Sequence, residues 1–164
     1  MQTFLNFKEL LNSNENIIVN ELSLSYKRSL QLNDPQFKQL NSSTKVSNLL
    51  REIWDEDQLE VRESFYLLCF STGLDLLGYQ KISEGGLDAV VVDLRLLFSI
   101  ALLSRATSIV IAHNHPSGTL KPSQADKILT EKIVQAGELF SIRVNDHIIL
   151  TESCYYSFRD EGLL

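Results

Sequence analysis

The sequence lacks the features of secreted, membrane-spanning and disulfide-rich proteins. No apolar run approaches the ~20 residues needed to cross a bilayer, and the N-terminus has no basic segment followed by an apolar one, as a secretory signal would. The two cysteines, Cys69 and Cys154, lie far apart in unlike contexts, which excludes a disulfide framework and a Cys-x-x-Cys metal pair. We therefore expect a cytoplasmic protein with reduced thiols and no membrane contact.

Positive charge is also scarce. The 21 acidic residues outnumber the 15 basic ones, the formal net charge is −6, and no basic run exceeds the pair Lys27-Arg28. Tight binding of nucleic acid through its phosphates therefore has little support. We expect any affinity for random duplex DNA at physiological salt to be weak, in the nonspecific range of about 10⁻⁴ M.

Glycine is missing from the first 72 residues, because all seven glycines lie at position 73 or later. The N-terminal part must therefore form its turns without the residue that adopts positive φ most easily. The length of 164 residues, with 44% hydrophobic and 22% charged residues, is typical of one globular domain. We predict an N-terminal extension over residues 1–41, with a strand at Ile17–Tyr26 and an irregular segment at Gln31–Gln39, and a main domain over residues 42–164.

Apolar spacing in the main domain predicts a helix followed by two strands. After the potential N-cap residues Ser42–Thr44, apolar side chains recur at i, i+3, i+4, i+7 and i+8, which is the pattern of a one-faced helix. Ser64–Phe70 is apolar on both alternating faces, as a central buried strand should be. Ser71–Gly73 is expected to turn the chain, so that Leu74–Ile82 pairs back on that strand.

Further helices and strands alternate in the second half of the chain. Asp93 offers an N-cap to a helix, a strand at Thr107–His113 follows, and another helix begins near Ser123. The first of these helices has an apolar stripe formed by Leu94, Leu97, Phe98, Ala101 and Leu102. Ser141–Val144 and Asp146–Thr151 are predicted to close the sheet. The order β-β-α-β-α-β-β predicts a mixed sheet flanked by helices, in an α/β or α+β domain.

Two histidines stand where a buried strand ends. Strand alternation places His113 and His115 on the face that carries Ile109 and Ile111. Asp126 lies in the first turn of the following helix, so the intervening loop can bring its carboxylate towards both rings. Two neutral imidazoles and one carboxylate suit Zn²⁺, and three protein ligands leave a fourth position for water, as in catalytic sites.

Each of these residues also has a purely structural interpretation. A single histidine at a strand end is usually hydrogen-bonded in the core or at the surface. Ser123 and Asp126 have the spacing of a capping box, and the helix dipole favours a carboxylate at this position. The combination favours a metal site, because two of the chain's three histidines lie two residues apart beside proline, serine and glycine, with Ser123 and Asp126 downstream.

The segment His113-x-His115, seven residues, Ser123-x-x-Asp126 resembles the motif of JAMM or MPN-plus metalloproteases without a gap. Residues 113–118, 144–147 and 155–163 resemble the RadC-type branch of that superfamily, and the resemblance covers residues 42–164. It implies a cytidine-deaminase-like α/β sandwich and a zinc ion on His113, His115 and Asp126. It also implies that Ser123 hydrogen-bonds the metal-bound water or the oxyanion. Deaminases themselves are disfavoured, because their H-x-E and P-C-x-x-C ligands are absent.

The family motif also requires an upstream glutamate as general base, at the start of the first core strand. Glu63 opens that strand and resembles the family's E-x-F pattern, whereas Glu84 follows the second strand and is better explained as a solvated carboxylate. We predict Glu63 as the base. His147 lies outside the motif, and we favour a structural or supporting role for it. Ser117 is close to His115 but has no Gly-x-Ser-x-Gly surroundings, so we expect it to shape the loop.

Two functions remain open. In the first, the protein is a zinc hydrolase, in which Glu63 deprotonates a metal-activated water that attacks a peptide or isopeptide carbonyl, and Ser123 and the zinc stabilise the oxyanion. In the second, it is a non-catalytic MPN-type binding module associated with a DNA repair or replication assembly. The presence of Glu63 beside a complete ligand set favours the hydrolase, with a peptide or protein as substrate.

The family's association with DNA has no support in these residues. Larger RadC proteins carry a helix-hairpin-helix module that grips the DNA backbone, whereas residues 1–72 contain no glycine with which to form its hairpin. The label of DNA repair therefore comes with the family name alone.

Overall fold

The computed structural model describes residue 25, residue 37 and residues 39–85 and 91–164. The strand predicted at Ile17–Tyr26 and the irregular segment predicted at Gln31–Gln39 lie almost wholly outside the described residues, as does most of the predicted N-terminal extension.

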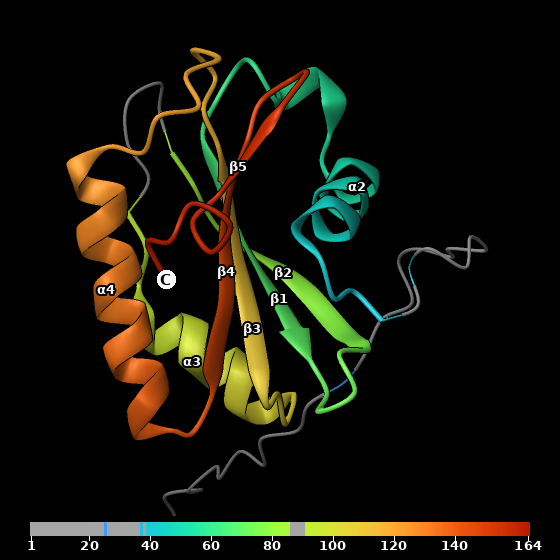
Figure 1. Cartoon of the computed structure of the whole chain (residues 1–164), viewed down its shortest axis with the longest axis vertical. Coiled ribbons are helices and arrows are strands. Elements are labelled where there is room, and N and C mark those ends of the chain that lie inside the picture. The colour runs from blue at the N-terminus through green and yellow to red at the C-terminus, as the bar shows by residue number, and fades with distance from the viewer. Residues whose placement is uncertain (1–24, 26–36, 38, 86–90) are drawn as a thin grey trace, which may run out of the picture.

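A five-stranded mixed sheet forms the centre of the protein (Figure 1). In the order β2-β1-β3-β4-β5, only β3 and β4 run parallel, and the other neighbours are antiparallel. The strands are β1 (Ser64–Phe70), β2 (Leu76–Glu84), β3 (Ser108–Asn114), β4 (Arg143–Leu150) and β5 (Tyr155–Ser157). All residues of β1 and β3 are buried. The predicted mixed sheet and the predicted central strand at Ser64–Phe70 are confirmed.

Helices cover both faces of this sheet. On one face lies α2 (Ser43–Ile53), which is followed by the short 3-10 helix η2 (Glu56–Gln58), and on the other lie α3 (Leu94–Leu103) and α4 (Gln124–Leu139) (Figure 1). The α4 helix forms the crossover that the parallel pair β3 and β4 requires. None of the described helices has the length and apolar character needed to cross a bilayer.

Alternation along β1 divides the apolar core into two layers. Its even-numbered residues pack with Leu49 and Leu50 of α2, whereas its odd-numbered residues pack with Leu97 of α3 and Ile133 of α4. Each large side chain that is fully buried in these layers stabilises the fold by roughly 1.5–3 kcal/mol. His113 is the cross-strand partner of the odd-numbered Phe65, and its side chain therefore lies on the face that α3 and α4 cover.

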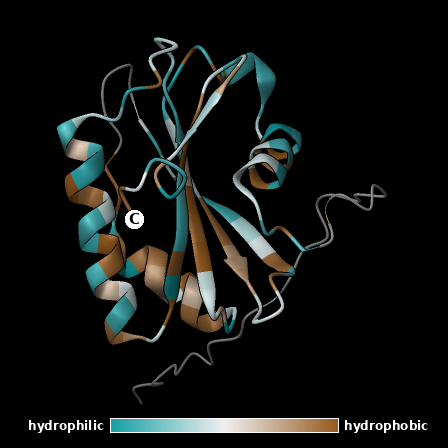
Figure 2. Cartoon of the chain, in the orientation of Figure 1, coloured by the Kyte–Doolittle hydropathy of each residue, from teal (hydrophilic) through white to brown (hydrophobic). Residues whose placement is uncertain are grey.

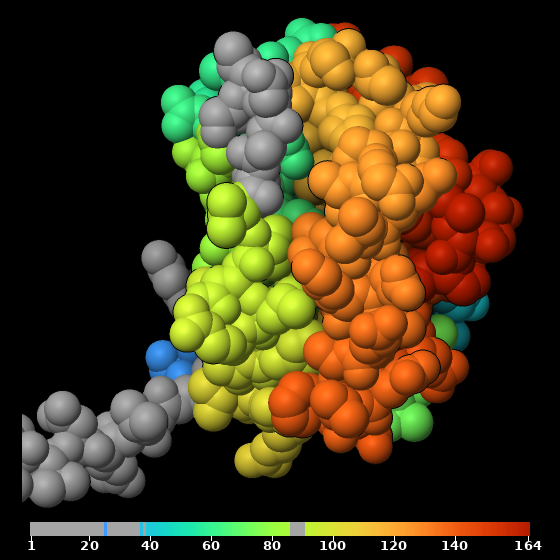
Figure 3. Space-filling model, turned by 90° about the vertical axis from the view of Figure 1, so that its left-hand side faces the viewer, coloured from blue at the N-terminus to red at the C-terminus, as the bar shows by residue number. Residues whose placement is uncertain are grey.

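The two helices on that face differ in character. The α3 helix is apolar over most of its length, whereas α4 alternates between apolar and polar residues (Figure 2). They lie side by side (Figure 3), and the rings of Phe98 and Phe140 are in contact, with centroids 5.3 Å apart. Of the apolar stripe predicted for α3, Leu97, Phe98 and Ala101 are buried, whereas Leu102 is 47% exposed and lies outside the core.

The predicted helix starts are confirmed by the N-cap contacts. The side chains of Ser42, Asp93 and Ser123 accept hydrogen bonds from backbone N–H groups in the first turns of α2, α3 and α4. At the start of α4 the capping box is complete, because Asp126 also accepts from the backbone N–H of Ser123.

Strand boundaries differ from prediction in two places. The second strand begins at Leu76, because Leu74 adopts a positive φ of 63° and belongs to the turn. The two closing strands predicted at Ser141–Val144 and Asp146–Thr151 form the single strand β4, and the last strand is β5. Asn145 is the extra residue of a bulge between β3 and β4, and its Nδ2 donates to Ser108 Oγ at 2.8 Å. Residue 145, which separated the two predicted closing strands, is therefore a bulge within the single strand β4.

Candidate metal centre

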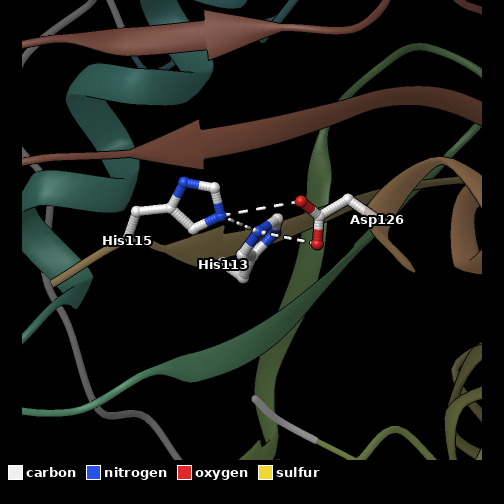
Figure 4. Close-up of side chains that lie close together, drawn as sticks. All are labelled: His113, His115 and Asp126. Atoms are coloured by element: carbon white, nitrogen blue, oxygen red, sulfur yellow. Dashed lines mark hydrogen bonds and ion pairs between the residues drawn. The ribbon is translucent and has the colours of Figure 1, made fainter. Parts of the chain in front are cut away.

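Side chains from β3 and α4 converge at one end of the sheet (Figure 4). His113 lies near the end of β3, His115 follows that strand, and Asp126 lies in the first turn of α4. The two Nε2 atoms are 3.0 Å apart. Asp126 Oδ1 lies 3.3 Å from His113 Nε2, and Asp126 Oδ2 lies 3.6 Å from His115 Nε2. This group could hold a metal ion, since one ligand atom from each residue lies within 4.8 Å of the others.

The donor set and its spacing fit a zinc ion. In a tetrahedral site with bonds of about 2.0–2.1 Å, neighbouring ligand atoms are separated by about 3.3–3.4 Å. The two Nε2 atoms are 3.0 Å apart, and the nearest Asp126 oxygen, a different one for each ring, lies 3.3 Å from His113 Nε2 and 3.6 Å from His115 Nε2, all close to that value. Lone pairs that face one another at such distances repel unless a proton or a cation lies between them. The side chains are only 1–15% exposed, so bulk water does little to screen this repulsion.

The second ring nitrogen of each histidine is held by another part of the protein. His115 Nδ1 donates to the backbone carbonyl of Thr119 at 2.5 Å. His113 Nδ1 lies 2.8 Å from Nε2 of His147 in β4. Contacts of this kind fix the orientation of a ligating imidazole and direct the free nitrogen to the metal. In both rings the nitrogen that faces Asp126 is Nε2.

The electrostatics keep His113 neutral and Asp126 ionised. Burial lowers the pKa of His113 to about 4. Burial raises the pKa of Asp126, but its hydrogen bonds with His115 and Ser123 and its electrostatic interaction with His113 outweigh burial, so the pKa lies below its usual value. The pKa of His115 is raised, mainly by its hydrogen bond with Asp126 and against the effect of burial. His113 and Asp126 are thus in their metal-binding protonation states at neutral pH.

Glu63 immediately precedes β1 and lines the same cavity as these three residues. Burial raises its pKa, the charge of His115 lowers it, and the charge of Asp126 raises it again. The segment around it is held by Asn114, which is fully buried. The Asn114 side-chain amide donates to the carbonyls of Leu59 (2.6 Å) and Arg62 (2.9 Å) and accepts from the Ser64 N–H (2.7 Å).

Asn114 has a positioning role that sequence reasoning missed. It stands between His113 and His115, and its three hydrogen bonds hold the segment that carries Glu63. An amide between two candidate ligands was the only local signal, and its partners lie 50 to 55 positions away in the chain.

Ser123 is both the N-cap of α4 and a residue of the cavity wall. Its Oγ accepts from the Asp126 N–H at 3.1 Å, and its side chain also hydrogen-bonds the Asp126 carboxylate. Its backbone N–H donates to Asp126 Oδ2 at 2.6 Å and so helps to orient the carboxylate. The capping contacts and a role in binding are therefore compatible.

Glu84 and Ser117 are engaged elsewhere. Glu84 forms ion pairs of 2.7 Å with Arg62 and with Lys81, its hydrogen bonds with them lower its pKa, and it does not line the cavity. Ser117 lines the cavity, but its hydroxyl donates to Thr119 Oγ1 at 3.2 Å, as expected of a residue that shapes the loop.

The cavity in front of these residues has a volume of about 460 Å³, within the range of small-molecule and peptide sites. Its lining is formed by Glu63, Phe65, Val92, His113, His115, Pro116, Ser117, Thr119, Lys121, Ser123, Ala125, Asp126 and Leu129. Carboxylates and imidazoles thus line a cavity that also has apolar walls, as a site for a substrate with both polar and apolar parts would require.

Comparison with known proteins places these features in a family. A family model described as "RadC-like JAB domain" matches residues 40–163. UPF0758 proteins of Flavobacterium johnsoniae and Thermotoga maritima are 39% identical over 128 residues and 35% identical over 127 residues, covering 78% and 77% of this chain and 55% of each relative. A UPF0758 protein of Methanosarcina barkeri is 42% identical over 103 residues, which are 63% of this chain and 45% of the relative. The chain spans about half the length of these curated relatives.

Proposed function

Because this chain belongs to the RadC-like JAB domain family, we propose that it is a zinc-dependent hydrolase that cleaves a peptide or isopeptide bond. One observation carries the proposal: two imidazoles and a carboxylate converge at a cavity that the half-buried Glu63 also lines. His113, His115 and Asp126 would hold the ion. When bound, Zn²⁺ supplies a Lewis acid that polarises a substrate carbonyl and increases the acidity of water.

Glu63 is the general base in this proposal. Burial raises the pKa of its carboxyl group and so brings it closer to the pH at which it must accept a proton and return it. The carboxylate takes a proton from the attacking water and then gives it to the leaving amine. The Asn114 hydrogen bonds on both sides of Glu63 support this role, because they limit the movement of the backbone that carries the base.

Ser123 stabilises the oxyanion that develops on the substrate carbonyl. The hydrogen bond that its Oγ accepts from the Asp126 N–H holds the side chain in place, and in this proposal the hydroxyl donates its hydrogen to the oxyanion. The residue also stands at the N-terminus of α4, where the helix dipole favours negative charge. A hydrogen-bond donor fixed in this way lowers the activation barrier most when the charge that it binds develops only in the transition state.

The substrate in this proposal is a peptide or a protein. The apolar side chains of the cavity wall, among them Phe65, Val92 and Leu129, can pack against substrate side chains next to the scissile bond. Among the described residues that line the cavity, Lys121 is the one lysine or arginine. We propose the cytoplasm as the place of action, in keeping with two cysteines that are both free thiols.

The test compares Glu63→Gln with the control Glu84→Gln. Zinc content is measured by elemental analysis, with Asp126→Ala as the metal-free reference, and turnover is measured on internally quenched peptides and on lysine-isopeptide substrates. Glu63→Gln should keep the zinc of the wild type and lose at least ~10²-fold in kcat. Glu84→Gln should keep both, because Glu84 lies outside the cavity.

The two variants separate the parts of the proposal. If Glu84→Gln lost activity while Glu63→Gln kept it, the assignment of the base would be wrong and the metal site would stand. If neither substitution changed turnover, the hydrolytic mechanism would have to be abandoned.

A further inference from the structure

His147 has no part in the chemistry above, although its ring is fully buried and contacts His113. We propose that Thr130 and His147 form a hydrogen-bond relay that holds His113 in the tautomer whose Nε2 lone pair faces the metal. The inference rests on the proposed metal site and adds to it the residues that decide which nitrogen of one ligand carries the proton. Thr130 and His147 are positioning residues, since they act through His113.

The relay begins at the hydroxyl group of Thr130 in α4. Its Oγ1 lies 2.6 Å from the backbone carbonyl oxygen of Asp126 and 2.6 Å from His147 Nδ1. Two oxygens at that distance repel unless a hydrogen lies between them, and a carbonyl can only accept. The single hydroxyl hydrogen is therefore donated to Asp126. Oγ1 can then act only as an acceptor towards His147.

The count of hydrogens fixes the remaining steps. His147 Nδ1 must carry the hydrogen that Thr130 accepts, and the neutral ring then has its lone pair on Nε2. That lone pair lies 2.8 Å from His113 Nδ1, so His113 is the donor and carries its hydrogen on Nδ1. Nε2 of His113 is left with a lone pair, directed at the space between Asp126 Oδ1 and His115 Nε2. This is the form in which an imidazole binds a metal.

Aromatic side chains enclose the relay. His147 stacks on Phe158 with centroids 4.6 Å apart and makes an edge-type contact with Phe65 at 5.9 Å. His113 stacks on Phe65 at 6.1 Å. These rings exclude water that could offer other hydrogen-bond partners, and they disfavour a charged imidazole. The arrangement brings together α4, β4 and β3, and it starts from the backbone of a residue that is itself a candidate ligand.

The test measures two quantities, the tautomer of His113 and the affinity of the protein for zinc. Long-range ¹⁵N NMR of the metal-free protein reports which ring nitrogen is protonated, and competition with a chelator gives the dissociation constant for zinc. We expect wild-type His113 to be protonated at Nδ1. Thr130→Val removes the hydroxyl and should mix the tautomers and weaken zinc binding by about 10–100-fold, whereas Thr130→Ser keeps the hydroxyl and should stay close to wild type. Ile133→Val, a core change on the same helix, should leave both readouts unchanged.

The outcomes distinguish the relay from the proposed function. A wild-type protein that binds zinc but holds His113 protonated at Nε2 when metal-free would overturn the relay and leave the metal site in place. Equal affinities and tautomers in Thr130→Val and Thr130→Ser would also overturn it. A protein that binds no zinc, yet shows the Nδ1-protonated form that Thr130→Val abolishes, would support the relay and refute the proposed function. Should Thr130→Val fail to fold, the wild-type tautomer and Thr130→Ser still decide the matter.

Discussion

The charge states of the three candidate ligands predict how zinc affinity depends on pH. Burial holds the pKa of His113 at about 4, and the pKa of Asp126 lies below its usual value. The pKa of His115 is raised above 6.5, because its hydrogen bond with Asp126 outweighs burial. Above about pH 5, His115 is therefore the one ligand of the three whose proton zinc must displace.

The steepness of the pH dependence of zinc affinity follows from the displacement of that single proton. Between about pH 5 and the pKa of His115, zinc affinity should rise about tenfold per pH unit, and above that pKa it should level off. The assay is competition with a fluorescent zinc chelator whose own protonation has been calibrated over the same range. The measurement should be repeated on Glu63→Gln, because Glu63 has a raised pKa and interacts with His115. A slope of one proton in both proteins is the expected result.

The folding stability of the metal-free protein should depend on pH in the direction opposite to zinc affinity: the contribution of His115 falls as the pH rises. His115 has a higher pKa in the folded protein than in the unfolded chain, so its contribution to stability is complete below about pH 6.5 and is lost as the pH rises through the folded value. Weak zinc binding at low pH therefore cannot be attributed to this group destabilising the fold. A slope of two protons would refute the neutral state of His113, and a flat profile would refute His115 as a ligand.

Two further predictions concern stability. His115→Ala should lose stoichiometric zinc in elemental analysis while its far-UV circular dichroism stays unchanged, because His115 belongs to neither core layer; global unfolding would instead show that the site is structural. Gly137→Ala should lower the free energy of unfolding in urea by roughly 1–3 kcal/mol, because a Cβ there would lie 2.5 Å from the Ile142 carbonyl oxygen. Gly78→Ala is the control, since its Cβ would have no neighbour within 4 Å, and equal losses in the two variants would contradict the steric argument.

Local patterns in the sequence were sufficient for the elements and the ligand motif. The double-sided apolar run Ser64–Phe70 predicted a central strand, and Ser123 predicted the start of α4, because burial on both faces and N-capping are each written in a few adjacent residues. The spacing of His113, His115 and Asp126 is likewise contained in one strand, loop and helix.

The supporting contacts of the site could not be predicted in this way. His147 reaches His113 across the β3–β4 pair, 34 positions away, and the register of that pair depends on the bulge at Asn145. The choice between Glu63 and Glu84 also depends on pairing, since Glu84 is the cross-strand partner of Ser64 and its carboxylate is held by surface cations. Such contacts depend on which strands are neighbours, and no local pattern encodes that.

The hydrogen bonds of Asn114 have a consequence for the fluctuations of the protein. Any local opening that detaches the segment of Glu63 must break the bond between the Ser64 N–H and Asn114 Oδ1, and it must do so next to both histidines. The amide hydrogen of Ser64 can exchange with solvent deuterium only in such open states. Its exchange rate therefore reports how often the base and the metal ligands separate, and it can be followed without a substrate or a metal ion.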